Sequence, residues 1–187
     1  QHYYARYADV LDAVVEIASV DTGDRVLDIG TGTGNLTVRC LGCGASVVGL
    51  DPSESMLAKA WDKIGRHPNL DLGRCSDPFL EIPYPDARFD AVVSTYAFHH
   101  IPHRLKAAAV DEMLRVLKSG GRWVVGDLAF EDEVAEAAAL RAYRWLEEEY
   151  FTRLDELREA FARHDISLQS RQFTPVTWVL WAVKSGV

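Results

Sequence analysis

The chain has 187 residues, 48% of them hydrophobic and 26% charged, which is the composition of an ordinary globular protein. A chain of this length buries roughly 70% of its unfolded surface, so we expect one domain over residues 1–187 that needs no disulfide or metal to fold. The 20 basic and 28 acidic residues give a net charge of -8, which argues against nucleic acid as a partner.

Neither a membrane span nor a signal peptide is predicted. No run of about 18 apolar residues occurs, and charged residues interrupt the amino-terminal stretch. We therefore expect a cytoplasmic protein that does not bind membranes, either as a monomer or as a homodimer.

The three cysteines, Cys40, Cys43 and Cys75, are predicted to be reduced thiols. Cys40 and Cys43 have the spacing of a redox or metal pair. No second cysteine pair or adjacent histidine pair completes a zinc shell around them. We assign no metal-binding residue from the sequence.

Helix and strand patterns alternate along the first half of the chain. The expected elements are a helix over 10–18, a strand over 26–29, a helix from 35, a strand over 46–50, a helix over 54–64 capped by Ser53, and a weaker strand over 70–74.

The second half continues the alternation and ends differently. The expected elements are strands over 89–95 and 123–126, helices over 105–117, 131–149 and 154–164, and strands over 167–173 and 177–183. We expect residues 119–121, Ser-Gly-Gly, to end the helix before them. Residues 174–176 are too few for a crossover helix, so the last two strands must pair antiparallel.

Both faces of the last strand are apolar, so helices should cover both faces of the sheet. The predicted fold class is therefore α/β, with a mostly parallel sheet flanked by helices and an antiparallel carboxyl-terminal strand. In such sheets ligands bind beyond the carboxyl ends of the strands.

A glycine-rich loop, Gly30-Thr31-Gly32-Thr33-Gly34, follows the first strand. The dinucleotide fingerprint G-x-G-x-x-G needs its third glycine one residue later, where this chain has Asn35. Asp28 would also oppose the charge of a bound pyrophosphate. A ligand with a cationic or amino group fits the loop better.

Two further carboxylates follow the next strands. Asp51 ends the second strand, where an acidic side chain can accept hydrogen bonds from both hydroxyls of a ribose. Asp77 follows the third strand, where a carboxylate can accept a hydrogen bond from an exocyclic amine such as that of adenine. An amino group, a ribose and an adenine together describe S-adenosylmethionine.

The strings VLDIGTGTGNLT, VVGLDPSESML and LKSGGRWVVGD resemble successive motifs of class I S-adenosylmethionine-dependent methyltransferases. GTGNLT, STYAFHH, EEEYFTRLDELREAF and VLWAVK resemble the bacterial YrrT-type methyltransferases within that superfamily. The resemblance covers most of the chain and implies a Rossmann-like methyltransferase fold. It also implies S-adenosylmethionine as methyl donor and S-adenosylhomocysteine as product.

The resemblance also implies roles for single residues. Asp28 and the backbone of the glycine loop would hold the methionine part, Asp51 the ribose, and Met56 the adenine, whose edge Asp77 and Phe79 would border. The full implied set of cofactor-binding residues is Asp28, Gly30, Thr31, Gly32, Asn35, Asp51, Pro52, Met56, Asp77, Pro78, Phe79 and Ser94. Met56 is also suited to filling the core, and Asp77 before Pro78 to a simple turn.

The sequence departs from the family pattern at two places. It starts at Gln1-His2-Tyr3, without the aromatic segment that closes over the cofactor in relatives, so we expect that lid to be absent. The helical stretch between Phe130 and Tyr150 is also shorter than the family pattern, which affects the cover over the substrate.

Candidate catalytic residues follow the fourth strand. Tyr96, His99 and His100 stand where the methyl group should lie, and an imidazole can take a proton near neutral pH. Adjacent side chains point in different directions, so we expect at most one of the two histidines to face the cavity. The other would be structural, and Tyr96 would then shape the pocket.

A mixed polar and aromatic wall is expected on the acceptor side. Its candidates are Asp127, Phe130, Glu131, Arg144, Trp145, Glu149 and Tyr150. The run 147–149, three glutamates, is also typical of a solvated helix face. The fourth strand lacks the N-P-P-[YFW] string of methyltransferases acting on base or glutamine amide nitrogens. With the acidic charge, this favours a small-molecule acceptor.

Three functions remain open at this level. The ordered motifs favour methyl transfer to a small molecule. A protein that binds S-adenosylmethionine or S-adenosylhomocysteine without catalysis would carry the same motifs. A dinucleotide-dependent oxidoreductase is disfavoured by the missing third glycine and by Asp28.

Overall fold

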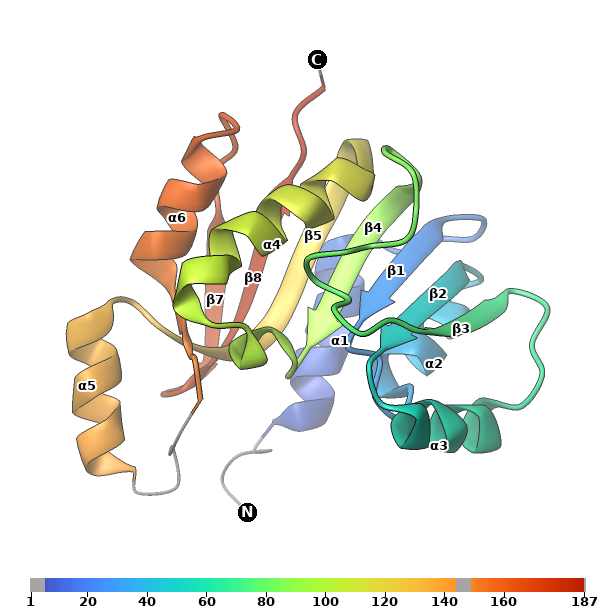
Figure 1. The fold of residues 1–187 in the computed structure, drawn as a ribbon, viewed down its shortest axis with the longest axis horizontal. Helices are drawn as coiled ribbons and strands as arrows, with labels where there is room; N and C mark the ends of the chain where they lie inside the picture. The colour runs from blue at the N-terminus through green and yellow to red at the C-terminus, as the bar shows by residue number, and fades with distance from the viewer. Residues whose placement is uncertain (1–5, 144–148, 187) are drawn as a thin grey trace.

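The computed structural model describes residues 6–143 and 149–186 of the chain, and its helices and strands alternate over most of that length (Figure 1). The helices are α1 (Tyr7–Ala18), α2 (Asn35–Gly42), α3 (Glu54–Ile64), α4 (His103–Val116), α5 (Glu133–Ala142) and α6 (Leu154–Ala162), with a short 3-10 helix η1 (Phe98–His100). The strands are β1 (Arg25–Ile29), β2 (Ser46–Asp51), β3 (Leu70–Arg74), β4 (Phe89–Thr95), β5 (Leu117–Phe130), β6 (Thr152–Arg153), β7 (Gln169–Thr174) and β8 (Thr177–Val183).

The strands form one sheet in the order β3-β2-β1-β4-β5-β8-β7, and β6 pairs with the end of β5. Strands β3, β2, β1, β4 and β5 run parallel, whereas β8 is antiparallel to both β5 and β7. The predicted fold class is confirmed, including the antiparallel carboxyl-terminal pair. Only Pro175 and Val176 connect β7 to β8.

Helices cover both faces of the sheet, as the apolar pattern of the last strand predicts. From β8, Leu180 and Ala182 join the core cluster that α4 and α6 cover, while Val179 joins the cluster on the α1 and α2 side. Figure 1 shows α4 and α6 in front of the sheet and α1 behind it. The two clusters fix the sheet as the central layer.

Strand β5 is longer than predicted. It begins at Leu117, directly after α4, and contains the Ser-Gly-Gly run that we expect to end that helix. Phe89 pairs with Leu117 but Ala91 pairs with Arg122, so extra residues of β5 bulge out between these pairs. Gly120, with φ of 77°, supplies the left-handed backbone that this bulge requires.

Helix α5 is shorter than the predicted 131–149. Asp132 caps its start by accepting a hydrogen bond from the Ala135 amide at 2.8 Å, and the helix ends at Ala142. After the segment 144–148, which lies outside the described residues, Phe151 is fully buried against Phe130, and Thr152 pairs with β5. Burial of Phe151 requires the chain to leave the helix and return to the sheet.

Within the described residues, none of the helices has both the length and the apolar character needed to cross a membrane. Because β3, β2, β1, β4 and β5 run parallel, their carboxyl ends share one edge of the sheet, which faces downward in Figure 1. The glycine loop after β1, Asp51 at the end of β2 and the histidine pair after β4 therefore meet at one edge of the sheet.

Candidate functional site

The glycine loop is held against β2 by its backbone. The amides of Gly30 and Thr31 both donate to the carbonyl of Leu50, at 2.8 and 3.0 Å. Gly30 and Gly32 have φ of 71° and 54°, which side chains disfavour. A Cβ at Gly30 would also collide with Ala97, so the loop packs directly on the chain after β4.

Asp28 lies beneath this loop and is almost fully buried. Its Oδ2 accepts hydrogen bonds from the hydroxyls of Thr31 at 3.0 Å and Thr37 at 2.6 Å, whereas no described residue donates to Oδ1. Burial raises the pKa of this carboxyl to about 6, and the two hydroxyls only partly offset that effect. A buried acceptor without a donor is the arrangement that a cationic ligand group completes.

Asp51 is fixed at the mouth of the site by two backbone donors. The amides of Gly32 and Ser53 donate to its Oδ2 and Oδ1, each at 2.8 Å. Each oxygen keeps a lone pair for a further donor. The carboxylate is therefore oriented before any ligand arrives.

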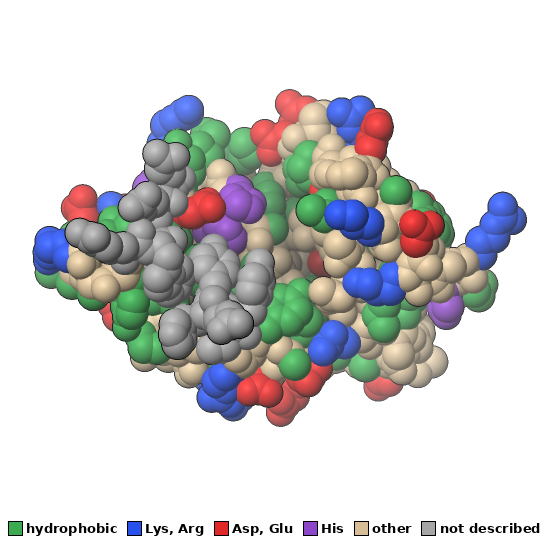
Figure 2. All heavy atoms as spheres, turned by 90° about the horizontal axis from the view of Figure 1, so that it is seen from below, with side chains coloured by type: hydrophobic (Ala, Val, Ile, Leu, Met, Phe, Trp, Pro, Cys, Tyr) green, Lys and Arg blue, Asp and Glu red, His purple; other side chains and the backbone are tan. Residues whose placement is uncertain are grey.

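A cavity of about 520 Å³ opens at this edge, and a smaller hollow of about 230 Å³ adjoins it. The predicted site residues that line the larger cavity are Gly30, Gly32, Asp51, Pro52, Met56, Asp77, Pro78, Phe79, Tyr96 and His100. Thr31 and Asn35 line the smaller hollow, together with Tyr7. Figure 2, seen toward this edge, shows histidine side chains beside a hollow in the surface.

Ser94 is a correction to the predicted set. It is fully buried in β4, and its hydroxyl donates to the Ile29 carbonyl at 2.7 Å, which links β4 to the end of β1. Among described residues it joins neither cavity lining. Its role is to hold the two strands that carry the site.

Met56 and Asp77 had two interpretations each. The Met56 side chain is not core filler: the residue is 38% exposed and borders both cavities. The turn interpretation of Asp77 is confirmed, because its Oδ1 accepts from the Leu80 amide at 3.3 Å. Asp77 also lines the larger cavity, and its role toward an adenine stays a prediction.

The two histidines have different environments, in line with the expectation that at most one faces the cavity. His99 is buried, with Nδ1 bonded to Asp127 Oδ1 and its amide 3.0 Å from Asp127 Oδ2. Burial opposes a charge on His99, but the Asp127 carboxylate outweighs burial and raises the pKa of the imidazole. His100 instead lines the cavity, and its side chain is 63% exposed.

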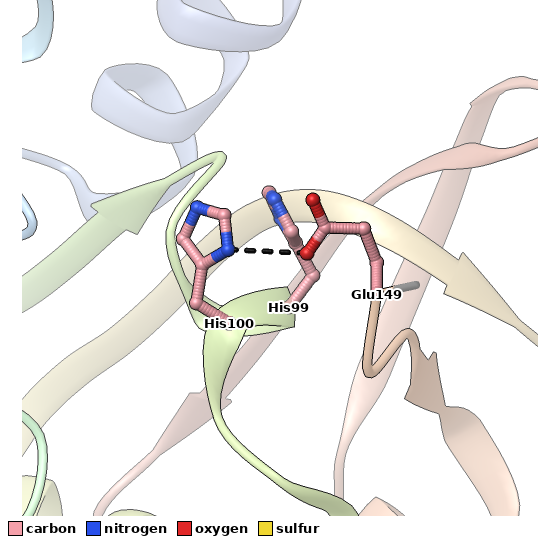
Figure 3. A group of neighbouring side chains, drawn as sticks. All are labelled: His99, His100 and Glu149. Atoms are coloured by element: carbon pink, nitrogen blue, oxygen red, sulfur yellow. Dashed lines mark hydrogen bonds and ion pairs between the residues drawn. The ribbon is translucent and has the colours of Figure 1, made fainter. Parts of the chain in front are cut away.

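Part of the predicted acceptor wall is corrected by these contacts. Asp127 is fully buried and paired with His99, and among the described residues it joins neither cavity lining. Glu149 does reach the site: its Oε2 lies 3.1 Å from Nδ1 of His100 (Figure 3). Arg144 and Trp145 lie outside the described residues.

Tyr96 directly follows β4 and has a φ of 52°, a backbone conformation that costs a tyrosine about 1–2 kcal/mol. Its ring stacks on Tyr7 of α1, with ring centres 5.3 Å apart, and it borders both cavities. The strain and the stacking place an aromatic wall between the two hollows.

Sequence reasoning missed several groups that hold the site. Lys63 Nζ donates to the Thr33 carbonyl and to Asn35 Oδ1, both at 2.7 Å, which ties α3 to the glycine loop. Lys106 is buried next to the histidines, donates to the Phe98 carbonyl at 2.8 Å, and has its pKa lowered to about 8 by burial.

Comparisons with known proteins identify the family of the chain. Residues 26–121 match the family model described as "Methyltransferase domain". An uncharacterized methyltransferase of Geobacillus thermodenitrificans is 38% identical over 97% of this chain and 88% of its own length. The uncharacterized methyltransferase YrrT of Bacillus subtilis is 33% identical over 95% of this chain and 84% of its own.

Solved structures share the fold. The YcgJ protein of Bacillus subtilis superposes with a TM-score of 0.79 at 18% identity, covering 96% of this chain and 100% of that one. Magnesium protoporphyrin IX methyltransferase (ChlM) of Synechocystis PCC 6803, solved with bound SAH, has a TM-score of 0.76 at 19% identity, covering 96% and 84%. By its family match and its relatives, the chain belongs to the methyltransferase-domain family, alongside the YrrT-type methyltransferases.

Proposed function

We propose that this chain transfers a methyl group from S-adenosylmethionine to a small-molecule acceptor and releases S-adenosylhomocysteine. The observation that carries the proposal is the unpartnered, buried Oδ1 of Asp28 beneath the glycine loop. Asp28 itself lines neither described cavity, but Gly30 and Gly32 of the loop line the larger one together with the preoriented Asp51. These groups match the ammonium and the ribose of one ligand.

The residues present fit this cofactor. Asp28 Oδ1 would accept from its ammonium group, and the two Asp51 oxygens from the ribose hydroxyls. Met56 and Phe79 supply apolar surface for the adenine, and Asp77 an acceptor for its amine. When bound, S-adenosylmethionine supplies an electrophilic methyl group on a sulfonium.

His100 is the proposed proton acceptor on the other side of the cavity. Glu149 accepts a hydrogen bond from Nδ1, which leaves Nε2 with a free lone pair. The acceptor's reacting atom would lie between Nε2 and the methyl group. Positioning there and exclusion of water account for much of the rate of such a transfer.

The acceptor is proposed to be a small molecule, and the reaction to be cytoplasmic. Support comes from the net charge of -8, which repels a phosphate backbone, and from the cavity volume, which suits a cofactor and a small acceptor.

Two alternatives are separated by binding measurements. Titration calorimetry with S-adenosylmethionine and, separately, with NAD should show binding of the first only; binding of NAD alone would reverse the assignment in favour of an oxidoreductase. Incubation with methyl-labelled cofactor and metabolite extracts should then label a product. Binding without any labelled product would favour the non-catalytic alternative.

Asp51→Ala should weaken cofactor binding by about 1.5–3 kcal/mol, the range for hydrogen bonds to a charged group. The variant should stay folded, because the two hydrogen bonds to backbone amides that it removes are only partly buried. Calorimetry measures the change, with Asp62→Ala on the exposed face of α3 as control. Equal affinities of the two variants would remove Asp51 from the site.

Cofactor affinity should rise about tenfold between about pH 5 and about pH 7. The raised pKa of Asp28, about 6, means that its carboxyl is mostly protonated at the lower pH and cannot pair with an ammonium group. At the higher pH it is mostly ionised. The Asp28→Asn variant should bind more weakly at pH 7 and show a flat profile; a wild-type slope in that variant would assign the titration to another group.

A further inference from the structure

Three side chains beside the cavity bring their metal-ligating atoms together. His99 and His100 come from η1, and Glu149 from the segment before β6. One ring nitrogen of each histidine and one Glu149 oxygen all lie within 4.8 Å of one another. Figure 3 shows the three side chains turned toward a common space, with Nδ1 of His100 3.1 Å from Glu149 Oε2.

His99 is oriented as metal-bound histidines are. Its Nδ1 is occupied by the fully buried Asp127 carboxylate, so Nε2 is the nitrogen left to bind an ion. A carboxylate that holds the far nitrogen of a histidine is the usual support of a metal ligand, because it fixes the ring and raises its basicity. The Tyr150 amide donates to the His99 carbonyl at 3.0 Å, which holds the Glu149 segment against η1.

We propose that His99, His100 and Glu149 bind a divalent transition-metal ion such as Zn²⁺. Two imidazoles and one carboxylate are a ligand set for Zn²⁺, Co²⁺ or Fe²⁺, whereas Mg²⁺ and Ca²⁺ prefer oxygen ligands alone. Three protein ligands leave at least one position open. Since His100 lines the cavity, that position is open to a molecule bound there.

The distances suit an ion after small side-chain rotations. Bonds of about 2.0–2.1 Å place two ligands of one ion about 2.9–3.4 Å apart, and the His100 to Glu149 separation of 3.1 Å already meets this. His99 is buried and held by Asp127. The side chains of His100 and Glu149 are 63% and 31% exposed, so they can turn toward His99.

The surrounding charges favour a cation. Asp127 and Glu149 contribute negative charge. Lys106, a positive group near them among the described residues, donates from its Nζ to the Phe98 carbonyl. The inference is independent of the proposed methyl transfer. If the methyl transfer and the metal site both exist, a metal-bound His100 cannot accept the proton. The ion would then bind an anionic oxygen or sulfur of the methyl acceptor.

The test is titration calorimetry of the chelator-treated chain with Zn²⁺ alone and with Mg²⁺ alone. One equivalent of Zn²⁺ should bind with micromolar or lower Kd, and Mg²⁺ should bind much more weakly. His100→Ala and Glu149→Gln should each weaken Zn²⁺ binding at least about tenfold. His164→Ala, which removes a surface histidine paired with Asp111 at 2.7 Å, is the matched control and should not change it.

The cysteines need a separate control, because Cys43 and Cys75 are only partly buried and thiolates are good ligands of Zn²⁺. The Cys43→Ser, Cys75→Ser double variant should retain the site, and bound Co²⁺ should show no thiolate charge-transfer absorption. Three results would overturn the proposal. They are the absence of Zn²⁺ binding, unchanged Zn²⁺ binding in His100→Ala and Glu149→Gln, and loss of Zn²⁺ binding in the cysteine double variant. S-adenosylmethionine binding measured on the same sample reports separately on the proposed function.

Discussion

Gly32→Val should raise the Kd for S-adenosylmethionine at least about 100-fold, or about 2.7 kcal/mol, in a chain that still folds. Gly32 lines both cavities, and its backbone φ of 54° is one that a β-branched residue resists. A Cβ there meets only the Gly30 carbonyl oxygen, at 3.9 Å, so the protein itself leaves room for it. The valine methyl groups would instead occupy space that the cofactor needs.

The matched control is Gly23→Val, in the turn between α1 and β1. Gly23 has φ of 90° and nothing within 4 Å of an added Cβ, so it carries similar backbone strain far from the cavity. Calorimetry should show near-normal cofactor binding by Gly23→Val, and thermal unfolding should report a similar stability loss in both variants. Normal cofactor binding by Gly32→Val would contradict the placement of the cofactor at this loop.

Local patterns were enough to predict most of the fold. The alternation of apolar runs and helical stripes placed the parallel strands, and the short connection before Thr177 fixed the antiparallel end. The grouping of several proposed cofactor-binding residues around one cavity could also be predicted, because they stand directly after strand ends that meet at one edge of a parallel sheet. Gly30, Asp51 and Met56 indeed border one cavity.

What the sequence left open depends on contacts between distant segments. The Asp127 side chain was interpreted as part of the acceptor wall because β5 was expected to end near it. Its pairing with His99 spans 28 residues and decides which histidine is structural. Glu149 reaches His100 across 49 residues, and no periodicity encodes such a meeting. The burial of Phe151, which ends the helical stretch early, is likewise a tertiary effect.

His100→Ala should lower turnover about 100-fold or more while leaving cofactor affinity nearly unchanged, the usual scale for loss of a general base. The imidazole lines the cavity and Glu149 holds its Nδ1, so Nε2 is available to the acceptor. The measurement is kcat and KM with the acceptor identified by labelling. His164→Ala, a surface variant, is the control and should retain both values.

Glu149→Gln and a chelator separate the roles that His100 can play. If His100 takes the proton, chelation should leave wild-type turnover unchanged. Glu149→Gln should then lower turnover less than His100→Ala does, because the glutamine oxygen still accepts a hydrogen bond from Nδ1. If a bound ion activates the acceptor, chelation should reduce wild-type turnover to the level of both variants, and added Zn²⁺ should restore turnover only in the wild type.

A higher KM with unchanged kcat in His100→Ala would instead show that the imidazole only positions the acceptor. A lower Tm with unchanged kcat and KM would show that its contact with Glu149 serves the fold alone.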